Sequence, residues 1–475
     1  MKDLFSPEGA LNQAVVAAGD FLWSYLLIGL LLLCGIYFTV RTRFVQFRMI
    51  GEMFRLLADK CEADSGTRRI SSFQAFAVSV ATRVGTGNLA GVAAAIAVGG
   101  PGAVFWMWLI TLIGSATAFV ESTLAQLFKR KANDSFVGGP AYYILHGLKS
   151  RRMAALFAVL LTLTFGISYN SIQSNTIGGA LEGAFGFDPT VTGCVVAAVA
   201  LVIVFGGIRR IAKFSSLIVP VMAGGYFLLA LTVTLMNYKA IPAVFGAIFD
   251  NAFGIGQFSG GAIGATILAG VKRGLFSNEA GEGSAPNVAA TASVSHPVKQ
   301  GLIQALGVFT DTLLVCSCTA FIILISGVYA DPSLNGIALT QTALDSQIGG
   351  SGAVFVAIAI FFFAFSSIIG NYYYGEANIL FLTQRKWVLT AFRIFSAGIA
   401  VIIGAVASLD LVWSVGDVFM GLLTLVNLIA IVILGKYAFR LLADYRAQKR
   451  RGITEPRFSA TDSMPEIADH LDWWK

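Results

Sequence analysis

Long apolar runs dominate this chain, and short polar or charged stretches separate them. We predict eleven membrane-spanning helices, at about residues 21–40, 73–98, 103–127, 153–182, 190–207, 214–236, 257–275, 300–327, 351–371, 388–408 and 411–435. The runs are close to the roughly 20 residues that a helix needs to cross a bilayer. An outer-membrane barrel would instead show segments of about ten residues with alternating character. The pattern predicts an all-α, polytopic membrane protein embedded in the lipid bilayer.

The run 73–98 is interrupted by four polar residues and three glycines, namely Thr82, Arg83, Thr86, Asn88, Gly85, Gly87 and Gly91. Glycine lowers the cost of leaving helical geometry. Non-helical backbone at membrane depth is tolerated only where protein or a wet cavity surrounds it. A helix-packing seam through Gly87 and Gly91 is the alternative, but it leaves Arg83 and Asn88 unexplained. We expect a broken helix whose free backbone groups hold a ligand and an ion.

The run 257–275 is also rich in glycine, and it passes into the polar stretch 276–299. This stretch has the composition of an unwound segment, with a cytoplasmic loop as the alternative. Without the first run, ten runs remain, and they divide into five plus five with inverted topology. The two interrupted runs then open the two halves, which is typical of a transporter site. We divide the chain into an N-terminal region 1–70, a first repeat 71–256, a second repeat 257–435 and a charged tail 436–475.

The distribution of basic residues predicts the orientation in the membrane. With the N-terminus outside, 30 of the 33 Lys and Arg residues fall in the expected cytoplasmic segments 41–70, 128–152, 207–213, 271–299, 385–393 and the tail. Such a bias is the positive-inside pattern of membrane proteins. It accounts for the net charge of +7 without a nucleic-acid partner. We expect the tail to be partly helical and then disordered.

Polar residues inside other runs are further candidates. Gln173 lies in the fourth run, and Ser366 and Ser367 place adjacent hydroxyls in the ninth, although both groups could serve only helix packing. Intramembrane charges are costly and functional by default, so Arg83, Glu121 and Asp311 stand out, with Glu279 as a possible partner for Arg83.

Several function classes are disfavoured by the same sequence. No histidine lies within a run, which argues against a histidine proton relay and a membrane-embedded enzyme. No nucleotide-binding motif supports direct drive by ATP. Two broken helices in opposite halves argue against a channel.

Four motifs resemble the signatures of the alanine or glycine:cation symporters, the sodium:alanine symporter family. They are VGTGNLAGVA at 84–93, GGPGAVFWMW at 99–108, GGPAYYI at 138–144 and GLFSNEAG at 274–281. The resemblance runs from about 70 to 435. It implies a LeuT-type core of five plus five helices, with broken first and sixth core helices, after one extra N-terminal helix.

The resemblance also implies a site and a function. Substrate would be held by Thr86, Gly87, Asn88, Gln173, Phe276, Ser277, Asn278 and Gly281. Sodium would be held by carbonyls near Thr82 and Val84 with Ser366 and Ser367, while Glu282 receives no role.

The expected protein is a secondary transporter of the bacterial plasma membrane. It would import a small neutral amino acid, alanine or glycine, with co-transported sodium, and a monomer could suffice. Proton coupling and a larger substrate such as glutamine are the alternatives.

Overall fold

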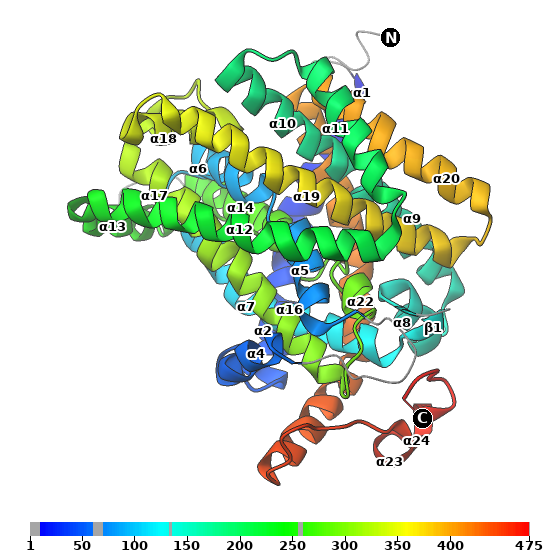
Figure 1. Ribbon diagram of the computed structural model, residues 1–475. Helices are drawn as coiled ribbons and strands as arrows, with labels where there is room; N and C mark the ends of the chain where they lie inside the picture. The colour runs from blue at the N-terminus through cyan, green and yellow to red at the C-terminus, as the bar shows by residue number, and fades with distance from the viewer. Residues whose placement is uncertain (1–9, 60–69, 133–134, 255–259, 475) are drawn as a thin grey trace.

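The chain folds into a bundle of helices, seen here in a computed structural model that describes residues 10–59, 70–132, 135–254 and 260–474 (Figure 1). Within these residues the only sheet is a small antiparallel pair, β1 (Arg130–Ala132) and β2 (Ser135–Val137). Helix α1 lies at the top of the view in Figure 1, and α23 and α24, near the end of the chain, lie at the bottom.

The first half of the chain supplies the helices up to α13. Their bounds are α1 (Ala10–Phe21), η2 (Leu22–Leu27), α2 (Ile28–Arg41), α3 (Val45–Arg48), α4 (Ile50–Leu57), α5 (Ser72–Arg83), η3 (Gly87–Gly91), α6 (Val92–Gly99), α7 (Ala103–Leu127), α8 (Pro140–Gly147), α9 (Arg151–Leu163), η4 (Thr164–Tyr169), α10 (Asn170–Phe185), α11 (Pro189–Val204), α12 (Gly207–Met236), η5 (Tyr238–Ala240) and α13 (Ile241–Ala252). Helix α5 begins with a capping box, in which Ser71 and Gln74 each accept a hydrogen bond from the other's backbone amide.

The second half begins with the glycine-rich helix α14. The bounds are α14 (Gly260–Asn278), α15 (Pro286–Ala289), α16 (Pro297–Phe309), η6 (Thr310–Cys316), α17 (Ser317–Ser326), η7 (Val328–Ala330), α18 (Gly336–Ile348), α19 (Ser351–Leu382), α20 (Lys386–Ile394), η8 (Phe395–Ile399), α21 (Ala400–Val406), α22 (Leu409–Arg450), α23 (Ala460–Ser463) and α24 (Pro465–Ala468).

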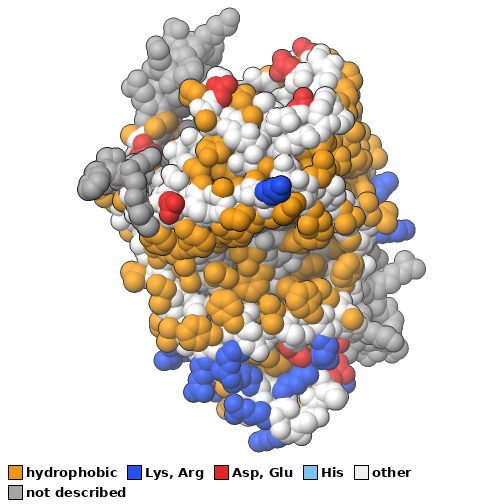
Figure 2. Space-filling view, turned by 90° about the vertical axis from the view of Figure 1, so that its left-hand side faces the viewer, with side chains coloured by type: hydrophobic (Ala, Val, Ile, Leu, Met, Phe, Trp, Pro, Cys, Tyr) orange, Lys and Arg blue, Asp and Glu red, His pale blue; other side chains and the backbone are white. Residues whose placement is uncertain are grey.

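Eight helical stretches among the described residues are long and apolar enough to cross a membrane. They are Val15–Arg41, Ala103–Leu127, Arg151–Phe185, Lys213–Met236, Pro297–Ser326, Ser351–Leu382, Lys386–Val406 and Leu409–Arg450. Each coincides with one of the apolar runs in the sequence. Figure 2 shows apolar side chains as a band across one face of the molecule, with most of the visible Lys and Arg below it. The protein is therefore a multi-pass membrane protein.

The two glycine-interrupted segments lie in the interior of this bundle. Helix α5 packs against α12 and α19, and α14 packs against α6 and α7. Figure 1 shows α12 and α19 crossing the centre of the molecule, where both pack against α5. The residues around both interruptions are buried.

Two features differ from the sequence expectation. Helix α18 occupies a stretch between two spans where no helix was expected. The tail is ordered rather than disordered, because Phe458 and Trp474 are buried and bonded to the rest of the chain. The Phe458 amide donates to the Ser295 carbonyl at 3.0 Å, and the Trp474 indole donates to the Gln126 carbonyl at 2.7 Å.

Candidate functional site

The first interruption separates α5 from η3. Helix α5 ends at Arg83, and Val84 is extended, with φ −77° and ψ 90°. The next two amides bond to side chains instead of helical carbonyls. The Gly85 amide donates to Asn88 Oδ1 at 2.8 Å, and the Thr86 amide donates to Gln173 Oε1 at 2.9 Å. The side chains of Asn88 and Gln173 thus accept hydrogen bonds from two amides that have no helical carbonyl partner.

The second interruption follows α14. Residues 279–285 lie between α14 and α15 and contain three left-handed positions, with φ of 56° at Glu279, 98° at Gly281 and 78° at Gly283. A Cβ atom on Gly283 would also lie 2.7 Å from Cγ of Pro140. Conformation and space therefore both require glycine at position 283.

The helical segments beside the two interruptions touch at Gly87, the first residue of η3. A Cβ atom added there would lie 3.0 Å from Ser277 Cα and 3.1 Å from Phe276 Cδ1. Glycine permits this close approach of the backbones, as it does at many tight helix crossings. The structure therefore brings Gly87, Phe276 and Ser277 together, as the resemblance implied.

Asp311 joins both sides of this contact. Its carboxylate accepts hydrogen bonds from Asn88 Nδ2 at 2.7 Å, Ser277 Oγ at 2.7 Å and Thr312 Oγ1 at 2.9 Å. Asp311 is fully buried, so these donors replace water as its hydrogen-bond partners. The sequence marks Asp311 as the only acid in the run 300–327, but it gave no role for it. Asn278 is a neighbour of this group, since its Nδ2 donates to Thr111 Oγ1 at 3.1 Å and Thr312 Oγ1 at 3.4 Å.

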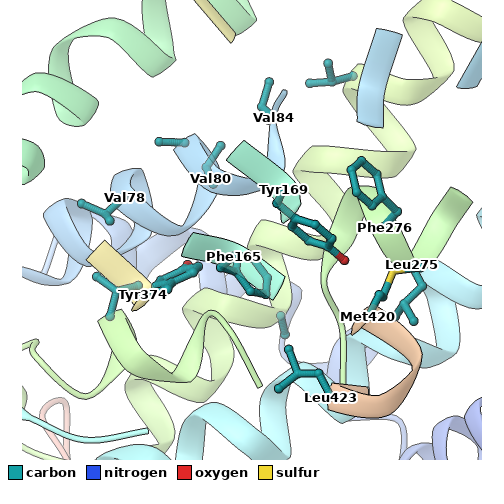
Figure 3. Close-up of a cluster of buried hydrophobic side chains, with 14 of the residues drawn as sticks. Val78, Val80, Val84, Phe165, Tyr169, Leu275, Phe276, Tyr374, Met420 and Leu423 are labelled. Atoms are coloured by element: carbon teal, nitrogen blue, oxygen red, sulfur yellow. The ribbon is translucent and has the colours of Figure 1, made fainter. Parts of the chain in front are cut away.

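Aromatic side chains pack around the contact between Gly87 and Phe276. The Phe276 ring lies 4.8 Å from the Tyr169 ring and 4.7 Å from the Trp413 ring. Figure 3 shows Tyr169 and Phe276 next to each other, with Val84 of the first interruption close by. Phe276 is almost fully buried, so packing between helices also accounts for its position.

A cleft of about 330 Å³ lies beyond Trp413. It is lined by residues near the start of the first and last spans, including Asp20 and Asp410, together with Asn335 and the α14 residues Lys272 and Arg273. The Arg273 guanidinium bonds both Asp417 oxygens, at 3.0 and 3.2 Å, and Lys272 lies 2.7 Å from the same carboxylate. The Arg273 guanidinium also stacks 4.1 Å from the Trp413 ring centroid. Two cations, one carboxylate and one indole therefore line the cleft, and the indole is also in contact with Phe276.

This arrangement corrects the placement of Lys272 and Arg273. The sequence analysis placed both at the end of the run 257–275 and also counted them in the cytoplasmic segment 271–299. They lie within α14, which continues to Asn278. The cleft that they line also contains Asp20 and Asp410, whereas Arg41 and Arg450 end the same two spans at the opposite end of the molecule. A pattern of basic residues could not reveal this, because it does not show that Asp417 neutralises them.

The two serines of α19 face the first interruption. Ser367 Oγ lies 2.9 Å from the Ala81 carbonyl and 3.4 Å from the Val84 carbonyl, and Ser366 Oγ lies 3.4 Å from the Ala81 carbonyl. Two hydroxyl and two carbonyl oxygens thus gather at the end of α5. Oxygen-only ligands suit hard cations.

The carbonyl that lies beside the serines near Thr82 is that of Ala81, and the Thr82 side chain makes other contacts. Its hydroxyl contacts Tyr374 OH at 3.0 Å and the Ser79 carbonyl at 2.8 Å. In the described structure no hydrogen bond joins Thr82 to either serine. Ala81, one residue earlier, supplies the carbonyl in the expected group.

Gly281 lies with a second polar group. Its amide donates to Glu121 Oε1 at 3.3 Å, and its carbonyl accepts from Asn427 Nδ2 at 2.8 Å. Asn427 also donates to Glu121 at 2.8 Å. These contacts tie the unwound segment 279–285 to α7 and α22. The hydrogen bonds described for Gly281 therefore link it to Glu121 and Asn427 rather than to Asn88 or Ser277.

Glu279 was a possible partner for Arg83, but the described residues show no ion pair between them. Arg83 Nη1 donates to the Gln304 carbonyl at 3.3 Å, and its Nε and Nη2 have no hydrogen-bond partner among the described residues. Glu279 instead accepts from Ser284 Oγ at 2.5 Å. Glu282 is a further buried acid that the sequence analysis passed over, and the Tyr169 hydroxyl lies 3.2 Å from its carboxylate.

The kind of protein that has this site follows from its family. The model of the sodium:alanine symporter family matches residues 8–460. The chain belongs to the sodium:alanine symporter family. This symporter is 54% identical to the probable sodium/glutamine symporter GlnT of Bacillus subtilis, over 93% of this chain and 92% of that protein. It is 50% identical to the amino-acid carrier protein AlsT of the same organism, over 98% of both chains.

Solved structures agree with the fold. The symporter superposes on MhsT in complex with L-phenylalanine with a TM-score of 0.58 and 16% sequence identity, covering 79% of this chain and 96% of that one. At this identity the likeness shows the fold alone, which is the LeuT-type fold. The family and the relatives make this protein a transporter and not an enzyme.

Proposed function

We propose that this symporter imports a small neutral amino acid, alanine or glycine, together with sodium. The observation that carries the proposal is the contact between the two interrupted helices at Gly87 and Ser277. Helix interruptions of this kind offer backbone amides and carbonyls at membrane depth. The bacterial plasma membrane is the proposed location.

The amino acid would bind across this contact. The Gly85 and Thr86 amides lie at the start of a helix, where partial positive charge favours a carboxylate. They now bond to the neutral oxygens of Asn88 and Gln173, and a substrate carboxylate is a stronger acceptor for either amide. The close aromatic packing of Phe276 with Tyr169 and Trp413 favours a small substrate side chain.

Sodium would bind where Ser366 and Ser367 face the end of α5. The Ala81 and Val84 carbonyls and the two hydroxyls supply four oxygens without a charge. One charge that crosses 100 mV supplies about 2.3 kcal/mol, and a tenfold sodium gradient adds about 1.4 kcal/mol, so one ion could support roughly a 500-fold accumulation.

We also infer how the substrate reaches the site from outside the cell. We assign α5 to α6 and α14 to α15 as the broken first and sixth helices of a five-plus-five core, which follows one extra helix to give eleven spans. We place the cleft at Arg273 and Asp417 outside the cell, with the N-terminus outside and the tail inside. Separation of the Arg273–Asp417 pair and of the Phe276–Trp413 contact would then open the site to the exterior.

Glutamine is the second candidate substrate. The 54% identical relative carries the name of a probable sodium/glutamine symporter. In this proposal the backbone amides of the site bind the substrate carboxylate. Every amino acid has this group, so it does not distinguish alanine from glutamine.

The test is uptake by purified protein in liposomes. Labelled alanine and labelled glutamine are supplied in separate reactions with an inward sodium gradient, an inward proton gradient or neither. Concentrative alanine uptake only with sodium supports the proposal. Concentrative uptake of glutamine without alanine reassigns the substrate, and uptake driven by protons without sodium refutes sodium coupling.

A further inference from the structure

A pocket of about 260 Å³ lies at the end of the molecule opposite to the cleft, between the end of α2 and the last turns of α22. Arg41, Arg43, Arg446 and Arg450 line it. A smaller adjoining pocket shares Arg43 and Arg446 and adds Arg48. We refer to these five residues and the space between them as the arginine pocket.

The arginine pocket differs from the other basic residues at this end. Several of those have acidic partners: Arg55 and Lys449 bind Glu52 at 2.6 and 3.1 Å, Lys299 binds Asp59 at 2.7 Å, and Arg440 binds Glu466. In the described part of the chain, no carboxylate pairs with the five arginines of the pocket. Arg48 donates weakly to the Arg43 carbonyl at 3.5 Å, and Arg41 lies over the Phe439 ring at 5.2 Å. The positive-inside rule explains basic residues on one side, but not five that converge without counter-charge.

The backbone at the pocket is strained in a way that serves this convergence. Arg43 and Phe44 are consecutive left-handed residues, with φ of 56° and 60°. This conformation is unfavourable for bulky side chains, and strained residues of this kind cluster at functional sites. The result is a turn in which Arg43 lines the pocket while Phe44 is exposed.

The surroundings of the pocket are those of a membrane surface. Arg41 is the last residue of the first membrane-spanning stretch. Large apolar side chains beside it are exposed, with Val40 at 58%, Phe44 at 51% and Phe47 at 47%. On the face that Figure 2 displays, Lys and Arg gather directly below the apolar side chains. A ligand of the pocket can therefore hold a negative group among the arginines and extend acyl chains over the apolar side chains.

We propose that the arginine pocket binds the phosphate of an anionic phospholipid head group. Guanidinium groups bind phosphate oxygens in a bidentate manner, and basic pockets between membrane helices on one leaflet are suited to such head groups. A soluble phosphate shares this chemistry, but it would leave the exposed Phe44 and Phe47 without a role. This site is separate from the amino-acid and sodium sites and does not depend on which substrate is carried.

The test uses delipidated protein in detergent and native mass spectrometry to measure lipid binding. Phosphatidylglycerol and phosphatidylcholine are titrated against the wild type, the Arg43→Gln/Arg446→Gln variant and a matched control, Arg55→Gln/Arg440→Gln. The control removes two paired arginines from the same end of the molecule. Loss of two pocket arginines should weaken phosphatidylglycerol binding about 30-fold, while the control should bind as the wild type does.

The Arg43→Lys/Arg446→Lys variant keeps the charge and removes the bidentate geometry. Binding between that of the wild type and that of the glutamine variant is expected, and its melting temperature shows that it is folded. Equal affinity for the two lipids, or equal loss of binding in the pocket variant and the control, would overturn the proposal. The melting temperature is also measured with inorganic phosphate and with phosphatidylglycerol at the same concentration. An equal increase with inorganic phosphate alone would overturn the lipid assignment.

Discussion

Replacement of Gly87 by alanine tests whether the two interrupted helices must touch. The new Cβ would lie 3.0 Å from Ser277 Cα and 3.1 Å from Phe276 Cδ1. Favourable carbon–carbon contacts lie at about 3.5–4.0 Å, so the two backbones would have to separate by about half an ångström. Neither partner moves easily, because Asp311 holds Ser277 and two rings hold Phe276.

Overpacking of this kind costs about 1–3 kcal/mol. If this cost falls on the conformation that transports substrate, the population of that conformation decreases about 5- to 150-fold. We expect the initial rate of labelled alanine uptake in proteoliposomes to fall by this factor, with only a small decrease in melting temperature. Gly264→Ala is the matched control, since it lies in α14 and its Cβ would meet no atom within 4 Å. Equal uptake by both variants and the wild type would show that the contact does not control transport.

Three further outcomes are expected. The Ser366→Ala/Ser367→Ala variant should raise the sodium concentration for half-maximal uptake far more than either single change, because water can replace one lost hydroxyl; unchanged sodium dependence would place the ion elsewhere. Phe276→Ala should weaken alanine uptake and admit larger substrates, since a stiff wall rejects extra carbons by about 1–3 kcal/mol; an unchanged rank order in competition assays on folded protein would exclude Phe276 from the site. Burial alone would raise the pKa of Glu52, but hydrogen bonds from Arg55 and two neighbours lower it to about 2. Its contribution to stability is therefore complete above its ordinary value of 4.5 and is lost as the pH falls through about 2, so Glu52→Gln should flatten that part of the melting-temperature profile, and an unchanged profile would contradict the ion pair.

The apolar runs predicted most spanning helices well, because length and hydrophobicity alone determine whether a helix suits the bilayer. The predicted end of a helix was wrong where a charged residue pairs with a residue far away in the sequence. Lys272 and Arg273 look like the end of a span, but Asp417, more than 140 residues later, allows α14 to continue past them. Similarly, no local pattern indicates that Phe458 and Trp474 bind back to the bundle.

The candidate site was partly visible in the sequence for a related reason. Glycines and polar residues mark a broken helix, so Gly87 and Asn88 could be proposed from their types, whereas Ser277 was proposed from the family resemblance. The identity of their partners depends on helix register across the bundle. Asp311 as the common acceptor, and Ala81 rather than Thr82 as the carbonyl beside the serines, could be recognised only from the three-dimensional arrangement.

The folded tail constrains the order in which this protein can mature. Phe458 and Trp474 follow α22, so every membrane helix has left the ribosome before their contacts with Ser295 and Gln126 can form. Until then, the ends of α7 and α16 near Gln126 and Ser295 have no cover from the tail. The newly inserted bundle therefore passes through a stage at which this surface is accessible to other proteins, and the tail closes it after α22 has been made.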